Sequence, residues 1–299
     1  MTEPVIRTLD IHDAHLFDAL PDPLGAAEAH RATVHRPEWK RVALRDGRVV
    51  ARGAWWGGPD DTEPVNINWF DVAEGEEEAG AALLRSAPWQ VELEFNLPAG
   101  GREDPAVRAA ADTAFAAARA AGYEPLVERY LYRWTPECGL PERPGRLAFA
   151  PEADDAVFLD ALRRIHSATL DAHALKAIEE GGVEQAAREE LEFFHWCPSP
   201  REWWQVARNA DGEPVGIHIP ARNQTSAVIG FIGVLPEHRG NGYAYDLLVE
   251  CTRFLAEQGA ESISGATDRG NFPMAANFAR AGHPVVRERI NFHLPAVTA

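Results

Sequence analysis

The hydrophobic positions of the chain fall in short β-favouring runs that tight turns separate. Residues 39–56 form two such runs around an Asp-Gly pair at 46–47, and residues 203–219 form two around an Asp-Gly pair at 211–212. An Asp-Gly pair between two β-favouring runs is a typical signal of a hairpin turn. We therefore expect the same strand–turn–strand unit in each half of the chain.

The C-terminal half continues with alternating helical and β-favouring patterns. Residues 154–194 are rich in helix formers and are interrupted by Gly181-Gly182. The later patterns predict strands at about 203–208, 214–220, 226–235, 261–267 and 285–294, and helices at about 241–258 and 272–281. A stripe of apolar residues on the 241–258 helix indicates that it packs on a sheet. These patterns predict a mixed α/β fold.

The two halves resemble each other at their ends. Residues 121–129 read AGYEPLVER and residues 281–289 read AGHPVVRER, and an Ala-rich helical stretch precedes each. A repeat of roughly 160 residues is too long for a solenoid and fits a duplicated domain, although chance similarity of short strands stays an alternative. A Pro-rich linker at 135–146 would separate a first domain at 1–134 from a second at 147–299, because its prolines cannot continue a helix or a central strand.

Composition narrows the class of protein. The chain has 299 residues, 45% of them hydrophobic and 25% charged, which is typical of a globular protein with a proper core. Its formal net charge of −17 argues against a nucleic-acid partner. The three cysteines have no metal-ligand spacing, and we expect no metal. We expect no membrane segment and a cytoplasmic location, because no signal-like or long apolar run is found.

A glycine-rich loop in the C-terminal half carries the candidate chemistry. The apolar run 228–234 leads through Pro236 into residues 239–244 and then into the amphipathic helix. The first turn of a helix has unpaired N–H groups and a partial positive charge, and glycines let an anion approach them. The loop is therefore suited to hold a pyrophosphate, although a plain tight turn is the alternative. It lacks the Lys-Ser/Thr of a Walker A loop, and Tyr245 breaks the dinucleotide fingerprint.

The surroundings of this loop resemble the acetyl-CoA signature of the GNAT (general N-acetyltransferase) superfamily. The matching pattern is Val234-x-Pro236-x-x-Arg239-Gly240-x-Gly242-x-Ala244. Residues 271–274 with 281–283 are similar to the segment that follows it in the family. The resemblance covers about residues 147–297, and residues 1–134 look like a degenerate copy. It implies two tandem GNAT-like domains, each a mixed, mostly antiparallel central sheet flanked by helices.

The resemblance also implies an activity, namely direct transfer of an acetyl group from acetyl-CoA, as co-substrate, to the amine of a small molecule. The backbone beside the pantetheine arm would come from Gly233, Val234 and Leu235. The N–H groups at the pyrophosphate would come from Arg239, Gly240, Asn241, Gly242, Tyr243 and Ala244. The N–H of Val234 would also donate to the oxyanion that forms from the thioester. Asn271 would bind the cofactor arm, cap the following helix, or do both.

The chain departs from the family at its acid and base positions. Phe278 stands where many members have a tyrosine that protonates the leaving thiolate. Residues 228–234 contain no carboxylate that could act as the base. His218 is one candidate for the base, since the usual pKa of histidine suits the task, but a histidine on a strand is more often packed or exposed. The other candidates for the base are Asp268, Glu237 and His195 with Glu192. A catalytically silent CoA-binding or regulatory module of the same fold is therefore the alternative function.

Two further regions bear on the acceptor and on the first domain. Residues 165–197 would cover the acceptor site, and their histidines, Asp171 and aromatic residues are compatible with amine binding or with ordinary helix packing. At the place of the glycine loop, residues 71–80 of the first domain have four glutamates and no arginine. Because like charges repel a pyrophosphate, we expect the first domain to bind no CoA.

Overall fold

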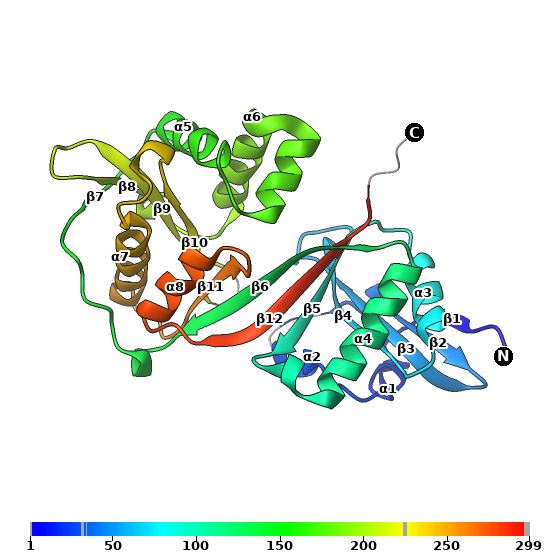
Figure 1. Cartoon of the computed structure of the whole chain (residues 1–299). Helices are drawn as coiled ribbons and strands as arrows, with labels where there is room; N and C mark the ends of the chain where they lie inside the picture. Colours follow the sequence, from blue (N-terminus) through cyan, green and yellow to red (C-terminus); the bar gives the residue numbers. More distant parts are fainter. Residues whose placement is uncertain (1, 31–32, 34, 224–225, 296–299) are drawn as a thin grey trace. The chain divides into compact units, whose positions relative to one another are not determined.

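The computed structural model describes residues 2–30, 33, 35–223 and 226–295. The chain divides into two compact units, of which unit 1 comprises Met1–Glu128 with Arg287–Ala299 and unit 2 comprises Arg129–Val286 (Figure 1). The division into domains at 1–134 and 147–299 stays a prediction. Among the described residues, no helix combines the length and the apolar character needed to cross a membrane.

Unit 1 is a sheet in the order β1-β2-β3-β4-β5-β12 with helices packed on it. Its strands are β1 (Val5–Thr8), β2 (Lys40–Arg45), β3 (Arg48–Trp56), β4 (Asn66–Val72), β5 (Glu92–Pro98) and β12 (Val285–His293). Its helices are α1 (Ala14–Phe17), α2 (Ala26–Ala29), α3 (Glu77–Arg85) and α4 (Pro105–Ala120), and its 3-10 turns are η1 (Pro37–Trp39) and η2 (Gly101–Glu103). Only β4 and β5 pair in parallel among the strand pairs of this unit that the structure describes.

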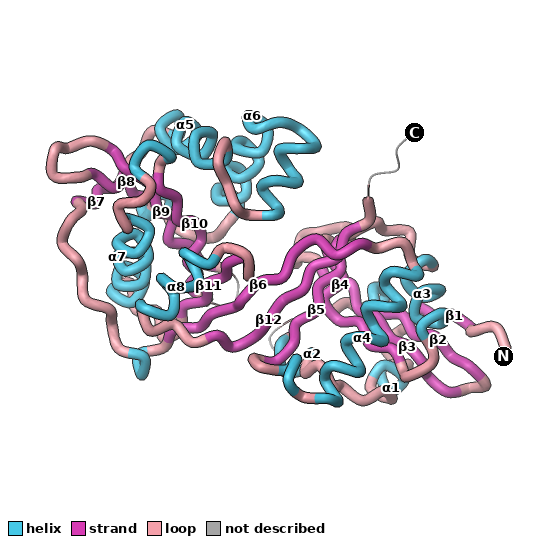
Figure 2. Tube along the Cα trace, in the orientation of Figure 1, coloured by secondary structure: helices cyan, strands magenta, loops and turns pink. Residues whose placement is uncertain are grey.

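Unit 2 repeats the arrangement with a sheet in the order β6-β11-β10-β9-β8-β7. Its strands are β6 (Glu124–Trp134), β7 (Ala148–Pro151), β8 (Gln205–Arg208), β9 (Pro214–Arg222), β10 (Ala227–Val234) and β11 (Ile263–Asp268). Its helices are α5 (Asp155–His166), α6 (Ala172–Trp196), α7 (Tyr243–Glu257) and α8 (Phe272–Arg280), and its 3-10 turns are η3 (Pro136–Cys138), η4 (Arg201–Trp203) and η5 (Pro236–His238). Both units are mixed, mostly antiparallel sheets flanked by helices, as the sequence predicts (Figure 2).

The strand that completes each sheet follows a helix of the other unit in the sequence. In unit 1, β12 pairs antiparallel with β5, with Arg287 opposite Pro98 and Phe292 opposite Leu93. In unit 2, β6 pairs antiparallel with β11. β6 follows α4 in the sequence and β12 follows α8, so each sheet is completed by a strand that is distant along the chain. Unit 1 therefore requires residues from the C-terminal end.

The Ala-Gly repeat noted in the sequence marks two identical helix ends. Gly122 after α4 and Gly282 after α8 both have a positive φ, of 94° and 76°. The N–H of Tyr123 donates to the carbonyl of Ala118, and that of His283 donates to Phe278, each at 3.0 Å. This bond pattern with glycine in the left-handed region is the Schellman motif, which satisfies the last carbonyls of a helix. The repeated Ala-Gly pair therefore ends α4 and α8 with the same hydrogen-bonded motif.

The sheet of unit 2 carries different helices on its two faces. On one face, Ile232 and Val234 of β10 pack with Leu247 of α7. On the other, a Cβ at Gly233 would lie 2.4 Å from Ile165 of α5, and the Phe231 ring lies 6.3 Å from that of Phe194 in α6. Side chains of a strand alternate between faces, so α7 and the α5–α6 pair lie on opposite sides of β10.

Candidate functional site

Strand β10 parts from its parallel neighbour after two residues. Its pairing with β11 joins only Ala227 to Ile263 and Val228 to Ser264. Its pairing with β9 continues to the end of the strand, with one extra residue, Gly230, as a bulge. From Ile229 onward the edge of β10 that would face β11 is therefore unpaired. An unpaired strand edge offers main-chain donors and acceptors to an extended ligand.

Val234 lies at the end of this open edge. The N–H of the next residue, Leu235, donates to the carbonyl of Val215 on the β9 side at 2.9 Å. Because successive residues of a strand point their N–H groups to opposite edges, the N–H of Val234 points to the open edge. This is the orientation that a donor to a thioester oxygen needs. The oxyanion role itself stays a prediction.

The glycine loop follows directly and opens onto α7. Gly240 and Gly242 have positive φ angles of 85° and 75°, which β-carbon atoms disfavour. In the described part of the chain, the N–H groups of Gly240, Asn241 and Gly242 donate to no backbone carbonyl outside helices and strands. Tyr243 begins the helix, whose first N–H groups have no partner within it. The loop thus presents consecutive free amides at the positive end of a helix dipole.

The side chain of Arg239 points back toward α5. Its Nη1 donates to the carbonyl of Ala168 at 2.5 Å, its Nη2 to that of Ile165 at 3.4 Å, and its Nε to that of Val234 at 3.4 Å. Three carbonyls therefore accept hydrogen bonds from the guanidinium of this motif residue. Arg239 connects the end of β10 with the segment between α5 and α6.

A second arginine, Arg146, holds the glycine loop from the Pro-rich segment. It donates to the carbonyl oxygens of Asn241 and Gly242 at 2.9 and 3.2 Å. It also pairs with the carboxylate of Asp246, which is buried in the first turn of α7. Sequence reasoning missed this residue, because a segment expected to be a linker gives no signal of contact with a loop about 95 residues away.

Asn271 and Phe278, which the sequence analysis singled out, both make contacts that stabilise α8 and its packing. Asn271 caps α8, since its side-chain oxygen accepts a hydrogen bond from the N–H of Met274 at 3.3 Å. Its binding of a cofactor arm stays a prediction. Phe278 is buried and stacks on Tyr132 with ring centroids 4.1 Å apart and planes 6° apart. Burial raises the pKa of Tyr132 to about 12.

His218, the base candidate from the sequence, lies away from the open edge. It pairs with Ile232 across the strands, which places it on the α7 face of the sheet. The ring is fully buried, its Nε2 lies 3.1 Å from the side-chain oxygen of Gln205, and burial lowers its pKa to about 3. The ring therefore lies on the face of the sheet opposite to α5 and α6, and its role as the base stays a prediction.

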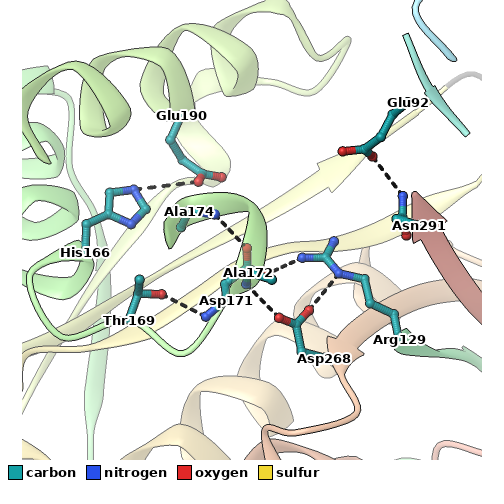
Figure 3. Close-up of polar contacts among 10 residues, drawn as sticks. All are labelled: Glu92, Arg129, His166, Thr169, Asp171, Ala172, Ala174, Glu190, Asp268 and Asn291. Atoms are coloured by element: carbon teal, nitrogen blue, oxygen red, sulfur yellow. Dashed lines mark hydrogen bonds and ion pairs between the residues drawn. The ribbon is translucent and has the colours of Figure 1, made fainter. Parts of the chain in front are cut away.

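A group of charged residues connects the end of β11 with the start of α6 (Figure 3). Asp268 accepts hydrogen bonds from the N–H of Ala172 and from Nε of Arg129, both at 2.7 Å. Arg129 also pairs with Asp171, the N-cap of α6, whose carboxylate accepts from the N–H of Ala174. The segment 165–172 is thus attached to β10 through Arg239 and to the end of β11 through Asp268.

Glu190 of α6 faces this segment. Its Oε2 lies 3.7 Å from Nε2 of His166, the last residue of α5 (Figure 3). A break in α6 at Gly182, with φ 81° and ψ 164°, separates the N-terminal part of the helix from the part that carries Glu190. Burial and the carboxylate of Asp171 raise the pKa of Glu190 to about 7. Sequence reasoning missed Glu190, and its spacing four residues before the buried Phe194 is the signal that could have found it.

Unit 1 has the open strand edge without the glycine loop. β4 pairs with β5 only at Asn66–Glu92 and Ile67–Leu93, as β10 does with β11. A short turn at 73–76 then leads straight into α3, whose N-cap position is Glu76. Glu77 and Glu78 occupy the first turn of that helix. The start of α3 therefore presents carboxylates where the start of α7 presents free amides.

Comparison with known proteins agrees with this geometry. Residues 163–283 match the family model of the Acetyltransferase (GNAT) family. A GCN5-related N-acetyltransferase from Sphaerobacter thermophilus is similar in structure, with 17% identity, a TM-score of 0.56, and coverage of 97% of this chain and 94% of that one. No curated protein matches the chain.

Two further solved structures match the chain at low sequence identity. A GCN5-related glucosamine N-acetyltransferase region of a fungal multi-domain GH3 beta-N-acetylglucosaminidase has 13% identity and a TM-score of 0.55, covering 97% of this chain and 38% of that one. A tandem GNAT protein from the clavulanic acid biosynthesis pathway has 17% identity and a TM-score of 0.49, covering 97% and 98%. Val234, the glycine loop at 239–244, Asp268 and Glu190 lie within the matched residues 163–283, whereas Arg129 and Arg146 precede them.

Proposed function

We propose, starting from the GNAT acetyltransferase domain at residues 163–283, that unit 2 transfers an acetyl group from acetyl-CoA directly to the amine of a small molecule. The observation that carries the proposal is the open edge of β10 from Ile229 to Val234, followed by free amides at the start of α7. The pantetheine arm would lie along the open edge as an added strand. The pyrophosphate would accept hydrogen bonds from the amides of residues 240–244, whereas the N–H of Arg239 donates to the carbonyl of Pro236 at 3.2 Å.

The reaction balances without a further reactant. An ammonium acceptor loses one proton to a base, and its nitrogen then attacks the thioester carbon. The N–H of Val234 donates to the oxyanion, a contribution of about 3 kcal/mol for one such donor in other acyl-transfer enzymes. The C–S bond then breaks, and the thiolate takes the second proton from the nitrogen. The products are the amide and the free thiol of CoA.

Release of that thiol tests the proposal on the full-length protein. The protein would be mixed with acetyl-CoA and a panel of primary amines, and free thiol would be measured with a thiol reagent. We expect thiol release that depends on one or more of the amines. Binding of acetyl-CoA without thiol release across the panel would contradict the enzymatic proposal.

The second candidate function is a CoA-binding or regulatory module without catalysis. Phe278, which is buried against Tyr132, favours it, because the family's usual proton donor at this position is absent. The absence of a carboxylate between Val228 and Val234 points the same way. The same thiol measurement separates the two functions, since both require CoA binding and only the enzyme releases thiol.

A further inference from the structure

The imidazole of His166 is buried without a hydrogen bond. The residue is 3% exposed, and neither ring nitrogen has a hydrogen-bond partner among the described residues. Its Nε2 lies 3.7 Å from Glu190, which is longer than a hydrogen bond. Buried polar groups are normally hydrogen-bonded, because leaving one unpaired costs about 1–3 kcal/mol. A polar group that contacts both the ring and the carboxylate would satisfy this nitrogen, and at a separation of 3.7 Å it would bridge the two from the side.

The pair lies over the end of β10 on the face that α5 and α6 cover. The ring of His166 lies 6.4 Å from the ring of Phe231, edge to face. Phe194 lies 6.3 Å from the same ring, and Glu190 precedes Phe194 by one helical turn. The Phe231 ring also lies 2.7 Å from the place where Gly233 would carry a Cβ. His166 and Glu190 are thus close in structure to the residues that precede the oxyanion donor Val234.

The charges around Glu190 favour a cation. The groups that face it are Asp171 and His173 from the start of α6, Arg129 from β6 and His166 from α5. Two carboxylates, Asp171 and Asp268, share the single guanidinium of Arg129. Burial lowers the pKa of His166, so its ring is neutral at pH 7 and can accept a hydrogen bond. The group therefore carries a net negative charge once Glu190 ionises.

We infer that Glu190 is the general base of the transfer proposed above and that the acceptor is a cationic primary amine held between Glu190, Asp171 and His166. Glu190 takes one proton from the ammonium and passes it to solvent. The nitrogen that is left carries the lone pair that attacks the thioester carbon. The inference rests on the proposed function. It assigns the base to α6, because β10 has no carboxylate that could take this role.

The test compares Glu190→Gln with Glu189→Gln in the full-length protein. Glu189 is an exposed residue on the same helix, hydrogen-bonded to Gln185, and serves as the matched control. We expect Glu190→Gln to lower kcat/KM for an accepted amine by about 10²- to 10⁴-fold, the usual contribution of a general base. We also expect kcat/KM of the parent protein to rise with pH up to about pH 7, and we expect this rise to be absent in Glu190→Gln. Acetyl-CoA binding by calorimetry should stay the same in both variants.

A second readout does not depend on turnover. Protein labelled with ¹³C at glutamate carboxyl groups gives a Glu190 signal, assigned by its loss in Glu190→Gln. We expect this signal to titrate near pH 7 and its pKa to fall when butylammonium chloride is added, whereas butan-1-ol should leave it unchanged. Titration in the ordinary glutamate range, or no response to butylammonium, would overturn the inference.

The outcomes separate this inference from the proposed function. If Glu190→Gln keeps the parent rate and pH profile, Glu190 is not the base, while acetyl transfer stands. If the parent protein binds acetyl-CoA but acetylates no amine, the proposed function fails. In that case the response of Glu190 to butylammonium shows only whether an amine binds beside Glu190.

Discussion

Nε of Arg146 donates a 3.1 Å hydrogen bond to Oδ1 of Asp246, a buried carboxylate in the first turn of α7. A carboxylate at that place would repel a pyrophosphate bound to the neighbouring amides. The guanidinium neutralises it and holds the carbonyls of Asn241 and Gly242 at the same time. A residue outside the family motif thus shapes the charge and the backbone of the glycine loop.

Replacement of Arg146 by methionine should weaken acetyl-CoA binding by at least tenfold, because it leaves Asp246 unpaired beside the loop. Arg143→Met is the control, since Arg143 belongs to the same segment but pairs with Glu250 and Glu257 along α7. Calorimetry on both variants checks the prediction. The double variant Arg146→Met with Asp246→Asn should recover part of the affinity, and equal affinities of the two single arginine variants would contradict the role of Arg146.

Gly242→Glu should lower the affinity for acetyl-CoA by about 100-fold or more, because it places a carboxylate against the diphosphate. Gly212→Glu matches it in backbone strain, since Gly212 has a φ of 80° and Gly242 a φ of 75°. Gly212 lies in the turn between β8 and β9, outside the glycine loop at residues 239–244. If both variants bind acetyl-CoA like the parent, the loop is not the cofactor site.

Unit 1 should bind no acetyl-CoA, so calorimetry on the full chain should give one molecule of acetyl-CoA per protein. The reason is the carboxylates of residues 76–78 at the start of α3. The full chain is needed because β12 completes the sheet of unit 1. Two bound molecules per chain, with one site lost in Gly242→Glu, would contradict the prediction.

Arg52→Met should lower the free energy of unfolding by about 3–5 kcal/mol, the usual cost of breaking a buried ion pair. Arg52 is 2% exposed, pairs with Asp71, and donates to the carbonyls of Phe17, Leu20 and Pro21. Urea denaturation measures the change. Arg85→Met, which breaks an exposed pair with Glu78, should cost less than about 1 kcal/mol. Similar losses in the two variants would count against the structural role of Arg52.

The protein should lose stability as the pH falls from about 6.5 toward 4. Burial lowers the pKa of His218 to about 3 and that of His283 to about 4. In this range the unfolded chain binds protons at both residues and the folded chain does not, so the free energy of unfolding falls by up to about 1.4 kcal/mol per pH unit for each. His218→Gln should flatten this dependence, measured by urea denaturation at several pH values. The exposed His12→Gln should leave it unchanged, and an unchanged slope in both variants would be contrary to expectation.

Local patterns predicted one hairpin in each unit and most of the other elements of unit 2. The strand–turn–strand units appear as β2–β3 and β8–β9, and the apolar stripe appears as the buried face of α7. Gly181-Gly182 marks the break in α6. These features depend on residues close together in the chain, so periodicity and turn chemistry reveal them.

Features that depend on distant residues could not be predicted in this way. β6 and β12 read as ordinary strands, and only their pairing shows which sheet each completes. The contact of Glu190 with His166 needs both the break in α6 and the packing of α5. Arg239 was expected at a pyrophosphate because of its place in the motif, yet its guanidinium binds carbonyls of the α5–α6 segment.

A crystal structure of the protein with acetyl-CoA tests the central claim most directly. The account predicts diphosphate oxygens within about 3 Å of the N–H groups at residues 240–244 and the thioester oxygen at the N–H of Val234. A bound cofactor that leaves these amides without contact, or lies outside the open edge of β10, would contradict the account.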